Sequence, residues 1–336
     1  MLIRRLSALF SLLFLLLGLK PAPERKTEPK VTGSFIQAWY CAGWDDARWD
    51  AETQWMREAG IDTLILQSLA SMDENGVWSV SYASSLPVFR GACSGDALSG
   101  ALKSCKKAGV RLFVGLADFA DWWNAAGFSA DYPGVCGVMA DMQREIYENY
   151  AAEYGDTLYG WYFPPEIDNV LPMKLAIPRI AKGLNTVLET ATALDPAMPV
   201  MLSPYFSEQY TVPSALETLP MWQAFFAAAD FRPGDIFCPQ DAVGAGWTSE
   251  KNLEKVWQMY ASAVEYSGKG VRLWANCENF TSTDAGNVPA PLSRFTRQLE
   301  TASKYAEKLV CFSMNHFYSP YTDEAAYDAY LNAFVN

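Results

Sequence analysis

The sequence predicts an α/β protein with a single domain, a (β/α)8 TIM barrel. Short apolar or β-branched segments alternate with amphipathic helical segments eight times along the 336 residues. Half of the residues are hydrophobic, so the chain has enough apolar side chains for one large core. No glycine-rich phosphate loop follows the first strand segment, which argues against the alternative of a doubly wound open sheet. We therefore expect a closed parallel barrel.

The eight predicted strands are short runs of apolar, β-branched and aromatic residues, bounded by polar or turn-forming residues. In chain order they are Ser34–Cys41, Thr63–Leu69, Arg111–Ala117, Leu158–Phe163, Pro199–Tyr205, Asp235–Cys238, Val271–Asn276 and Leu309–Met314. Each is followed by a longer segment before the next strand begins. This order is typical of repeated βα units, in which a helix returns the chain to the start of the next parallel strand.

The eight predicted helices have apolar residues at helical spacing, and several end at a glycine, the residue that most often follows the last helical turn. In chain order they are Asp50–Ala59, Asp96–Ala108, Val138–Tyr154, Leu175–Leu194, Pro220–Ala229, Ser249–Tyr266, Pro291–Ala306 and Asp323–Phe334. Gly60, Gly109, Gly155 and Gly268 stand at or just after four of these ends.

The N-terminal segment has the composition of a targeting signal. Residues 1–19 carry Arg4 and Arg5 before an apolar run from Leu6 to Leu19, the charged and apolar regions of a signal peptide. Residues 20–32 are rich in proline and charge and read as a linker, so the barrel is expected to occupy residues 33–336. We expect a secreted or extracellular protein, with a membrane tether through an uncleaved N-terminal segment as the alternative.

Composition excludes several classes of partner and cofactor. The formal net charge of −12 repels phosphate backbones, so no nucleic-acid partner is expected. His316 is the only histidine and no Cys-x-x-Cys pair occurs, so no metal site is expected. We also predict no organic cofactor and no protein partner.

Active sites of (β/α)8 barrels lie at the carboxyl ends of the strands. Glu166 and Glu278 directly follow the apolar fourth and seventh predicted strands. Two carboxylates in such a cleft are what general acid–base and nucleophilic chemistry at a glycosidic bond requires. The alternative is that each glutamate is a buried structural group. We predict Glu166 and Glu278 as catalytic residues.

Other polar and aromatic side chains follow the predicted strands and would meet at the same mouth. Sugar rings present C–H faces that pack against indole, and Trp44, Trp78, Trp122, Trp123 and Trp247 all fall in predicted loops. These observations predict a carbohydrate substrate. The predicted substrate-binding residues are Gln37, Trp44, Gln67, Asp118, Trp122, Tyr205, Gln240, Asp241, Asn276, His316 and Tyr318.

Three segments carry a resemblance to a known family: Gly33–Gln37, Ala59–Gln67 and Gly160–Ile167. They resemble the domain-of-unknown-function family 4434, which consists of exported bacterial proteins regarded as glycoside-hydrolase-like barrels. The resemblance extends over nearly the whole chain after the linker. It implies the barrel fold and action on carbohydrate.

The chain also resembles clan A of the glycoside hydrolases, retaining barrels with an acid/base glutamate after strand four and a nucleophile after strand seven. This resemblance implies that Glu166 is the acid/base and Glu278 the nucleophile. Clan A enzymes usually have asparagine before the acid/base to hold the substrate 2-hydroxyl, where this chain has Pro165. Gln67 or Asn276 is then expected to take that role.

The sequence thus predicts a retaining glycoside hydrolase that acts on an extracellular or cell-wall polysaccharide or oligosaccharide. Pro165 keeps open an alternative from another class, a non-catalytic carbohydrate-binding barrel at the cell envelope. A third hypothesis is an inverting hydrolase that pairs Glu166 with Asp241 or Asp118.

Overall fold

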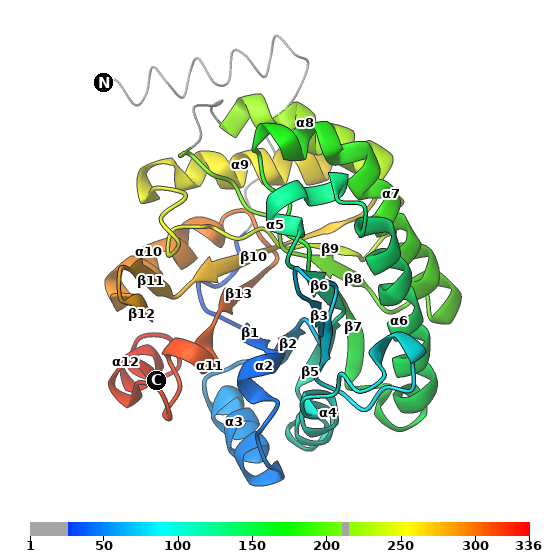
Figure 1. Ribbon diagram of the computed structural model, residues 1–336. Helices are drawn as coiled ribbons and strands as arrows, with labels where there is room; N and C mark the ends of the chain where they lie inside the picture. Colours follow the sequence, from blue (N-terminus) through cyan, green and yellow to red (C-terminus); the bar gives the residue numbers. More distant parts are fainter. Residues whose placement is uncertain (1–25, 210–214) are drawn as a thin grey trace.

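Eight parallel strands close into a barrel in the computed structural model, which describes residues 26–209 and 215–336 (Figure 1). Around the barrel the strands follow the order β1-β13-β10-β9-β8-β7-β5-β2. Their bounds are β1 Gly33–Gln37, β2 Thr63–Gln67, β5 Arg111–Gly115, β7 Leu158–Phe163, β8 Val200–Leu202, β9 Ile236–Phe237, β10 Arg272–Glu278 and β13 Lys308–Phe312. The predicted fold, a single-domain (β/α)8 barrel, is confirmed.

A ring of helices surrounds the strands (Figure 1). The long helices are α3 Asp46–Glu58, α4 Ala97–Ala108, α6 Tyr132–Tyr154, α7 Leu171–Leu194, α8 Ala215–Ala228, α9 Glu250–Ser267, α10 Leu292–Ala302 and α12 Glu324–Phe334. Side-chain caps and left-handed residues set several ends. Asp45 caps the start of α3 by accepting from the Arg48 N–H, and α4 ends at Gly109, whose φ is +67°.

The predicted first strand is too long, because its last four residues form the short helix α2, Ala38–Cys41. The parallel pairing of β1 with β2 stops at Gln37, opposite Gln67. Beyond that pair, Ala38 and Cys41, three residues apart, are the buried residues of this helix. An apolar run of four residues satisfies either conformation, so its composition does not distinguish them.

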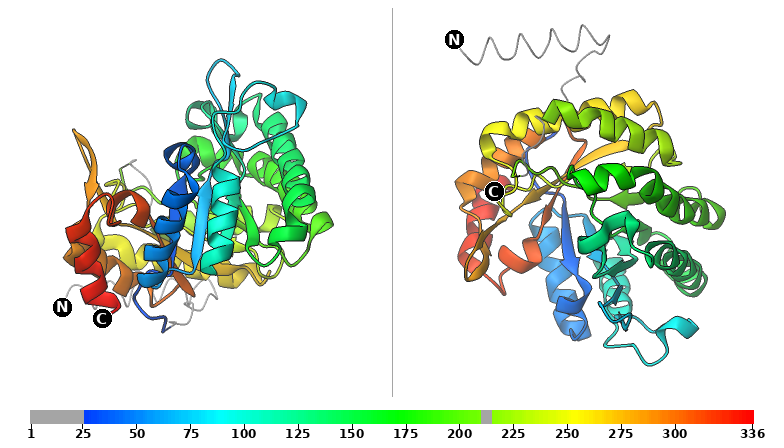
Figure 2. Two further views of the ribbon diagram at one scale, coloured as in Figure 1. Left: turned by 90° about the horizontal axis from the view of Figure 1, so that it is seen from below. Right: turned by 45° about the horizontal axis from the view of Figure 1, so that its top comes forward.

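Small elements absent from the prediction are inserted after the barrel strands. A three-stranded sheet joins β4 Trp78–Val80, β3 Ala70–Met72 and β6 Ala117–Phe119, and β11 Phe280–Thr283 pairs with β12 Gly286–Pro289 as a hairpin. Both project from one end of the barrel (Figure 2, left). The short helices are η1 Pro87–Phe89, α5 Trp122–Ala125, η2 Ala126–Phe128 and α11 Met314–Phe317.

Two cores support this end of the barrel. The larger lies between the strands and the helices, and the smaller fills the barrel interior with Phe35, Ile65, Phe113, Tyr162, Met201, Ile236, Cys238, Trp274 and Val310. A filled interior makes the barrel a rigid platform rather than a pore.

The end of the predicted linker contacts the barrel. The Thr27 hydroxyl donates to the Ala306 carbonyl over 2.6 Å, and the buried Val31 N–H donates to the Tyr330 hydroxyl over 3.1 Å. The predicted signal peptide, residues 1–19, and the linker's first residues lie outside the described residues. Within residues 26–209 and 215–336, no helix is both long and apolar enough to span a bilayer.

Candidate active site

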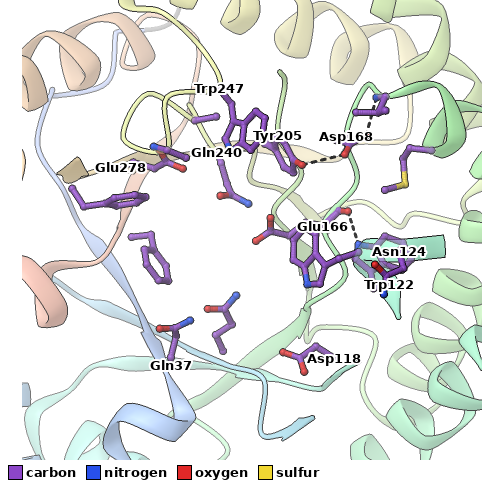
Figure 3. A pocket seen from close by; sticks show the side chains of 18 residues that line it. Gln37, Asp118, Trp122, Asn124, Glu166, Asp168, Tyr205, Gln240, Trp247 and Glu278 are labelled. Carbon is purple, nitrogen blue, oxygen red and sulfur yellow. Dashed lines mark hydrogen bonds between the residues drawn. The ribbon is translucent and has the colours of Figure 1, made fainter. Parts of the chain in front are cut away.

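A cavity of about 660 Å³ lies at the carboxyl ends of the barrel strands (Figure 3). Eight of the residues that the sequence predicted at the site line it: Gln37, Gln67, Asp118, Trp122, Glu166, Tyr205, Gln240 and Glu278. Figure 3 shows Glu166 and Glu278 on opposite sides of the open space. Their strands are the fourth and seventh of the barrel, which explains how residues 112 positions apart reach one cavity.

Glu166 reaches the cavity three residues beyond the end of β7. Pro164 and Pro165 fix the backbone between the strand and the glutamate. The Trp122 indole N–H donates to the Glu166 carbonyl over 2.8 Å and anchors this turn. Burial raises the pKa of the Glu166 carboxyl to about 7, and the nearby charges of Asp168 and Asp118 add to the rise, whereas a hydrogen bond from Gln240 opposes it.

Glu278 is the last residue of β10 and is only 3% exposed. One carboxylate oxygen accepts from the Ala245 N–H over 2.7 Å, and the Gly244 N–H also lies within reach. Burial raises the pKa of the Glu278 carboxyl, and the negative charges of Asp241 and Glu166 raise it further. Both glutamates line the same cavity, and the charge of Glu166 contributes to the raised pKa of Glu278.

Asp241 lies behind Glu278 and does not line the cavity, unlike the prediction that it contacts substrate. It is fully buried and accepts from three N–H groups: the backbone of Glu278 and of Val243, both over 3.2 Å, and the Gln298 side chain over 2.6 Å. Burial raises the pKa of the Asp241 carboxyl. Asp241 therefore joins the end of β10 to the loop that holds the Glu278 carboxylate.

Two further carboxylates face the cavity. Asp168 accepts from the Val170 N–H over 2.8 Å and from the Tyr205 hydroxyl over 3.1 Å (Figure 3). Asp118 projects from β6, and burial raises the pKa of both aspartates. No lysine, arginine or histidine of the described residues lines the cavity. Neither do the described residues contain a cluster of three histidine, cysteine or acidic side chains placed to hold a metal ion.

Trp44 and His316, both predicted to bind substrate, do not line the cavity. The Trp44 ring packs on Trp49 with centroids 5.0 Å apart. The His316 ring packs at a tilt against Tyr40, with ring centroids 4.1 Å apart, and burial lowers the pKa of His316 to about 4. Both rings are used in packing among the loops after the first and last strands.

Asn276 and Tyr318 also lie outside the cavity lining. The Asn276 amide N–H donates to the Ser203 hydroxyl over 3.3 Å inside the barrel. The Tyr318 hydroxyl donates to the Ala290 carbonyl over 2.7 Å. Because Asn276 does not line the cavity, the strand-end amides available for a substrate 2-hydroxyl are those of Gln37, Gln67 and Gln240.

The structure adds lining residues that the prediction did not include: Trp123, Asn124, Asp168, Val170, Met173, Ala242, Ala245, Trp247, Phe280 and Phe312. Asp168 stands two residues after Glu166, and the loop position of Trp123 and Trp247 was a usable signal. Ala245 contributes a backbone N–H, for which no side-chain pattern exists.

Several solved structures share the fold of this chain over most of its length. A protein of Bacteroides thetaiotaomicron provisionally named an alpha-L-fucosidase is 19% identical, with a TM-score of 0.73 over 93% of this chain and 97% of that chain. The endo-1,4-beta-D-mannanase of Thermotoga petrophila is 13% identical, with a TM-score of 0.54 over 84% and 88% of the two chains. The endo-1,4-beta-mannanase of Rhizomucor miehei is 10% identical, with a TM-score of 0.56 over 88% and 89%.

Comparison of sequences identifies a family. A search of curated proteins finds no significant match. Residues 31–324 match the profile described as "Domain of unknown function (DUF4434)". This match spans nearly all of the barrel, so the chain belongs to the DUF4434 family.

Proposed function

We propose that the chain is a retaining glycoside hydrolase, with Glu166 as acid/base and Glu278 as nucleophile. One observation carries this proposal: two carboxyls from the ends of the fourth and seventh strands face each other in one cavity. Burial and acidic neighbours raise the pKa of both carboxyls, but their hydrogen-bond donors differ: the Gln240 side chain bonds Glu166, whereas the backbone N–H of Ala245 bonds Glu278. Unequal environments of this kind divide two carboxyls between the acid role and the anion role.

The proposed reaction uses each group in turn. Glu166, protonated because of its raised pKa, gives its proton to the glycosidic oxygen as the bond to the anomeric carbon breaks. The Glu278 carboxylate attacks that carbon and forms a glycosyl ester, while the Ala245 N–H fixes one of its oxygens. Glu166 then takes a proton from water, which attacks the same carbon and releases Glu278.

The cavity lining fits an uncharged sugar. Amide groups of Gln37, Gln67 and Gln240 can bond hydroxyls, and the aromatic rings of Trp122 and Phe312 offer apolar faces. With four carboxylates and no cationic side chain among the described lining residues, an anionic sugar would be repelled. The fucosidase and mannanase names of the similar structures also refer to uncharged sugars.

We propose that the substrate is an extracellular or cell-wall glycan. The support is the signal-like residues 1–19, with their arginines and apolar run. Fractionation of cells that express the full chain, with and without residues 1–19, tests this location. Recovery of both forms in the same fraction would contradict it.

A second function remains as an alternative, a carbohydrate-binding barrel without catalysis. Pro165 favours it, because proline cannot supply the side-chain amide that clan A enzymes place before the acid/base. An inverting reaction with Asp118 as base is the other variant, since Asp118 lines the cavity and the buried Asp241 does not.

Glu278→Gln and Glu166→Gln test the proposal directly. Each should lower kcat by about 10²-fold or more on a glycan that the parent protein cleaves, because the nucleophile or the proton donor is lost. Kinetic assays with a panel of neutral glycosides measure this, and circular dichroism checks the fold. Glu58→Gln, on the surface of α3, is the matched control and should keep full activity.

Full activity of Glu278→Gln would overturn the assignment of the nucleophile. Glycan binding by calorimetry, without any product from the parent protein, would instead support the binding barrel.

A further inference from the structure

Trp123 is an exposed indole at the edge of the cavity. It is 66% exposed and lines the same cavity as Glu166. An indole this exposed to water lacks the stabilisation that burial usually gives tryptophan. Its position beside the proposed reacting groups, rather than its exposure alone, indicates that a ligand covers it.

The backbone that carries Trp123 is firmly anchored. The preceding residue, Trp122, is 3% exposed, and its indole N–H donates to the Glu166 carbonyl over 2.8 Å. The Trp122 ring also packs on Phe119 and Tyr132, with centroids 6.0 and 5.6 Å apart. One indole of the pair thus fixes α5 to the Glu166 turn, and the other is held outward in a preorganised position.

The next residue, Asn124, adds an amide that can bind a sugar hydroxyl. Asn124 is exposed and also lines the cavity, and Figure 3 shows it with Trp122 on the Glu166 side, away from Glu278. An indole face beside an amide can bind the C–H face of a sugar and one of its hydroxyls. Because Glu166 would protonate the leaving oxygen, its side of the cavity is where the leaving part of the substrate lies.

We infer that Trp123 and Asn124 form a subsite for an uncharged sugar residue on the leaving-group side, so that the substrate is a glycan chain rather than a simple glycoside. The assignment of this subsite to the leaving-group side of the glycan rests on the proposed function. The binding of a glycan chain at Trp123 can be measured whether or not hydrolysis occurs.

Affinity electrophoresis in gels with galactomannan, arabinoxylan or xyloglucan tests the subsite. All variants carry Glu278→Gln so that the polysaccharide stays intact. At least one polymer should retard the protein that carries Glu278→Gln alone. Adding Trp123→Ala should weaken that binding about tenfold, whereas adding Trp123→Phe should keep most of it. Trp39→Ala is the matched control, since Trp39 is 70% exposed on the short helix α2 but does not line the cavity.

A second measurement separates this subsite from catalysis. In the chain that retains Glu278, Trp123→Ala should lower kcat/KM for the polymer about tenfold more than for glycosyl fluorides, because fluoride is too small a leaving group to contact the indole. An equal loss on polymer and glycosyl fluorides would overturn the subsite, as would equal retardation of Trp123→Ala and the Glu278→Gln protein, or a Glu278→Gln protein that no polymer retards. Cleavage of glycosyl fluorides without polymer binding leaves the glycosidase standing. Trp123-dependent binding without any cleavage leaves the subsite standing and removes the hydrolase.

Discussion

The Glu278 carboxyl is held between opposing influences. Burial and the charges of Asp241 and Glu166 raise its pKa, whereas the N–H groups of Ala245 and Gly244 stabilise its ionised form. A nucleophile must ionise, so the protein holds an anion in a place where burial disfavours it. This arrangement should carry a cost in stability that depends on pH.

Glu278→Gln should therefore stabilise the protein at pH 8. Between the ordinary carboxyl pKa and the raised one, the folded state binds more protons than the unfolded state, so the free energy of unfolding falls as pH rises. Glu278→Gln has no carboxyl to titrate at this position, so it should avoid this loss of unfolding free energy, on the order of 1–3 kcal/mol at pH 8. At pH 4, where the carboxyl is protonated in the folded state, the difference should vanish. Thermal unfolding at both pH values measures it.

Glu145→Gln is the control with the opposite sign. Although burial raises the pKa of Glu145, hydrogen bonds from Ser84 and Ser85 lower it below its usual value. This variant should lose stability at pH 8, where the carboxylate is fully ionised. A Glu278→Gln protein that melts below the parent at pH 8 would show that the Glu278 anion is stabilised rather than strained.

At the residue scale, the sequence placed Glu166 and Glu278 at or just beyond strand ends, and both line the cavity, while their catalytic roles stay a prediction. Glu166 and Glu278 were predictable because a carboxylate after an apolar strand must face the mouth or find a partner. Asp241 follows β9 in the same way, yet its side chain turns to the backbone of Glu278. That choice depends on where the loop returns, which the local sequence does not contain.

At the element scale, the loop from β9 to α9 determines the geometry around Glu278. Ala242 has a left-handed backbone with φ of +53°, an uncommon conformation for a residue with a side chain. This turn brings residues 242–245 over the end of β10. Gly244 passes so close that an added Cβ would lie 2.4 Å from the Phe280 carbonyl oxygen and 2.9 Å from a Glu278 carboxylate oxygen.

Gly244→Ala should lower activity without unfolding the barrel. The methyl group cannot fit beside Phe280 and Glu278, so the loop must shift and take the Ala245 N–H away from the carboxylate. We expect kcat to fall about tenfold or more, since misplacing a reacting group has large effects on rate. Gly246→Ala is unsuitable as a control because its φ is +77°, whereas Gly134→Ala in α6 meets open space. Kinetics of both variants, with melting temperatures, test this; equal activity would exclude a role for the loop.

The regular elements were predictable and the inserted ones were not. Hydrophobic alternation located all eight barrel strands and all eight long helices, with ends displaced by a few residues. Barrel strands as short as β8 and β9 were located by their place in the strand–helix alternation, whereas the β3–β4–β6 sheet and the β11–β12 hairpin lie outside that alternation. They lie where the chemistry is expected, so the least predictable part of the chain shapes the cavity.

At the scale of the whole molecule, the closed barrel is what brings distant residues into one site. Strands four and seven carry their carboxyls to the same end because all eight strands are parallel, and the filled interior holds them apart. The eightfold alternation therefore predicted the meeting of Glu166 and Glu278 without any knowledge of distances. The acidic balance of the chain, −12, matches a cavity that repels anions.

Covalent trapping tests the central claim most directly. The protein would be incubated with 2-deoxy-2-fluoroglycosyl fluorides of uncharged sugars, including mannose, galactose and glucose, and its intact mass and peptides measured. A retaining glycosidase should gain one fluoroglycosyl group on Glu278, and Glu278→Gln should gain none. Cleavage of glycosides with inversion at the anomeric carbon, or a label on any residue other than Glu278, would contradict the assignment.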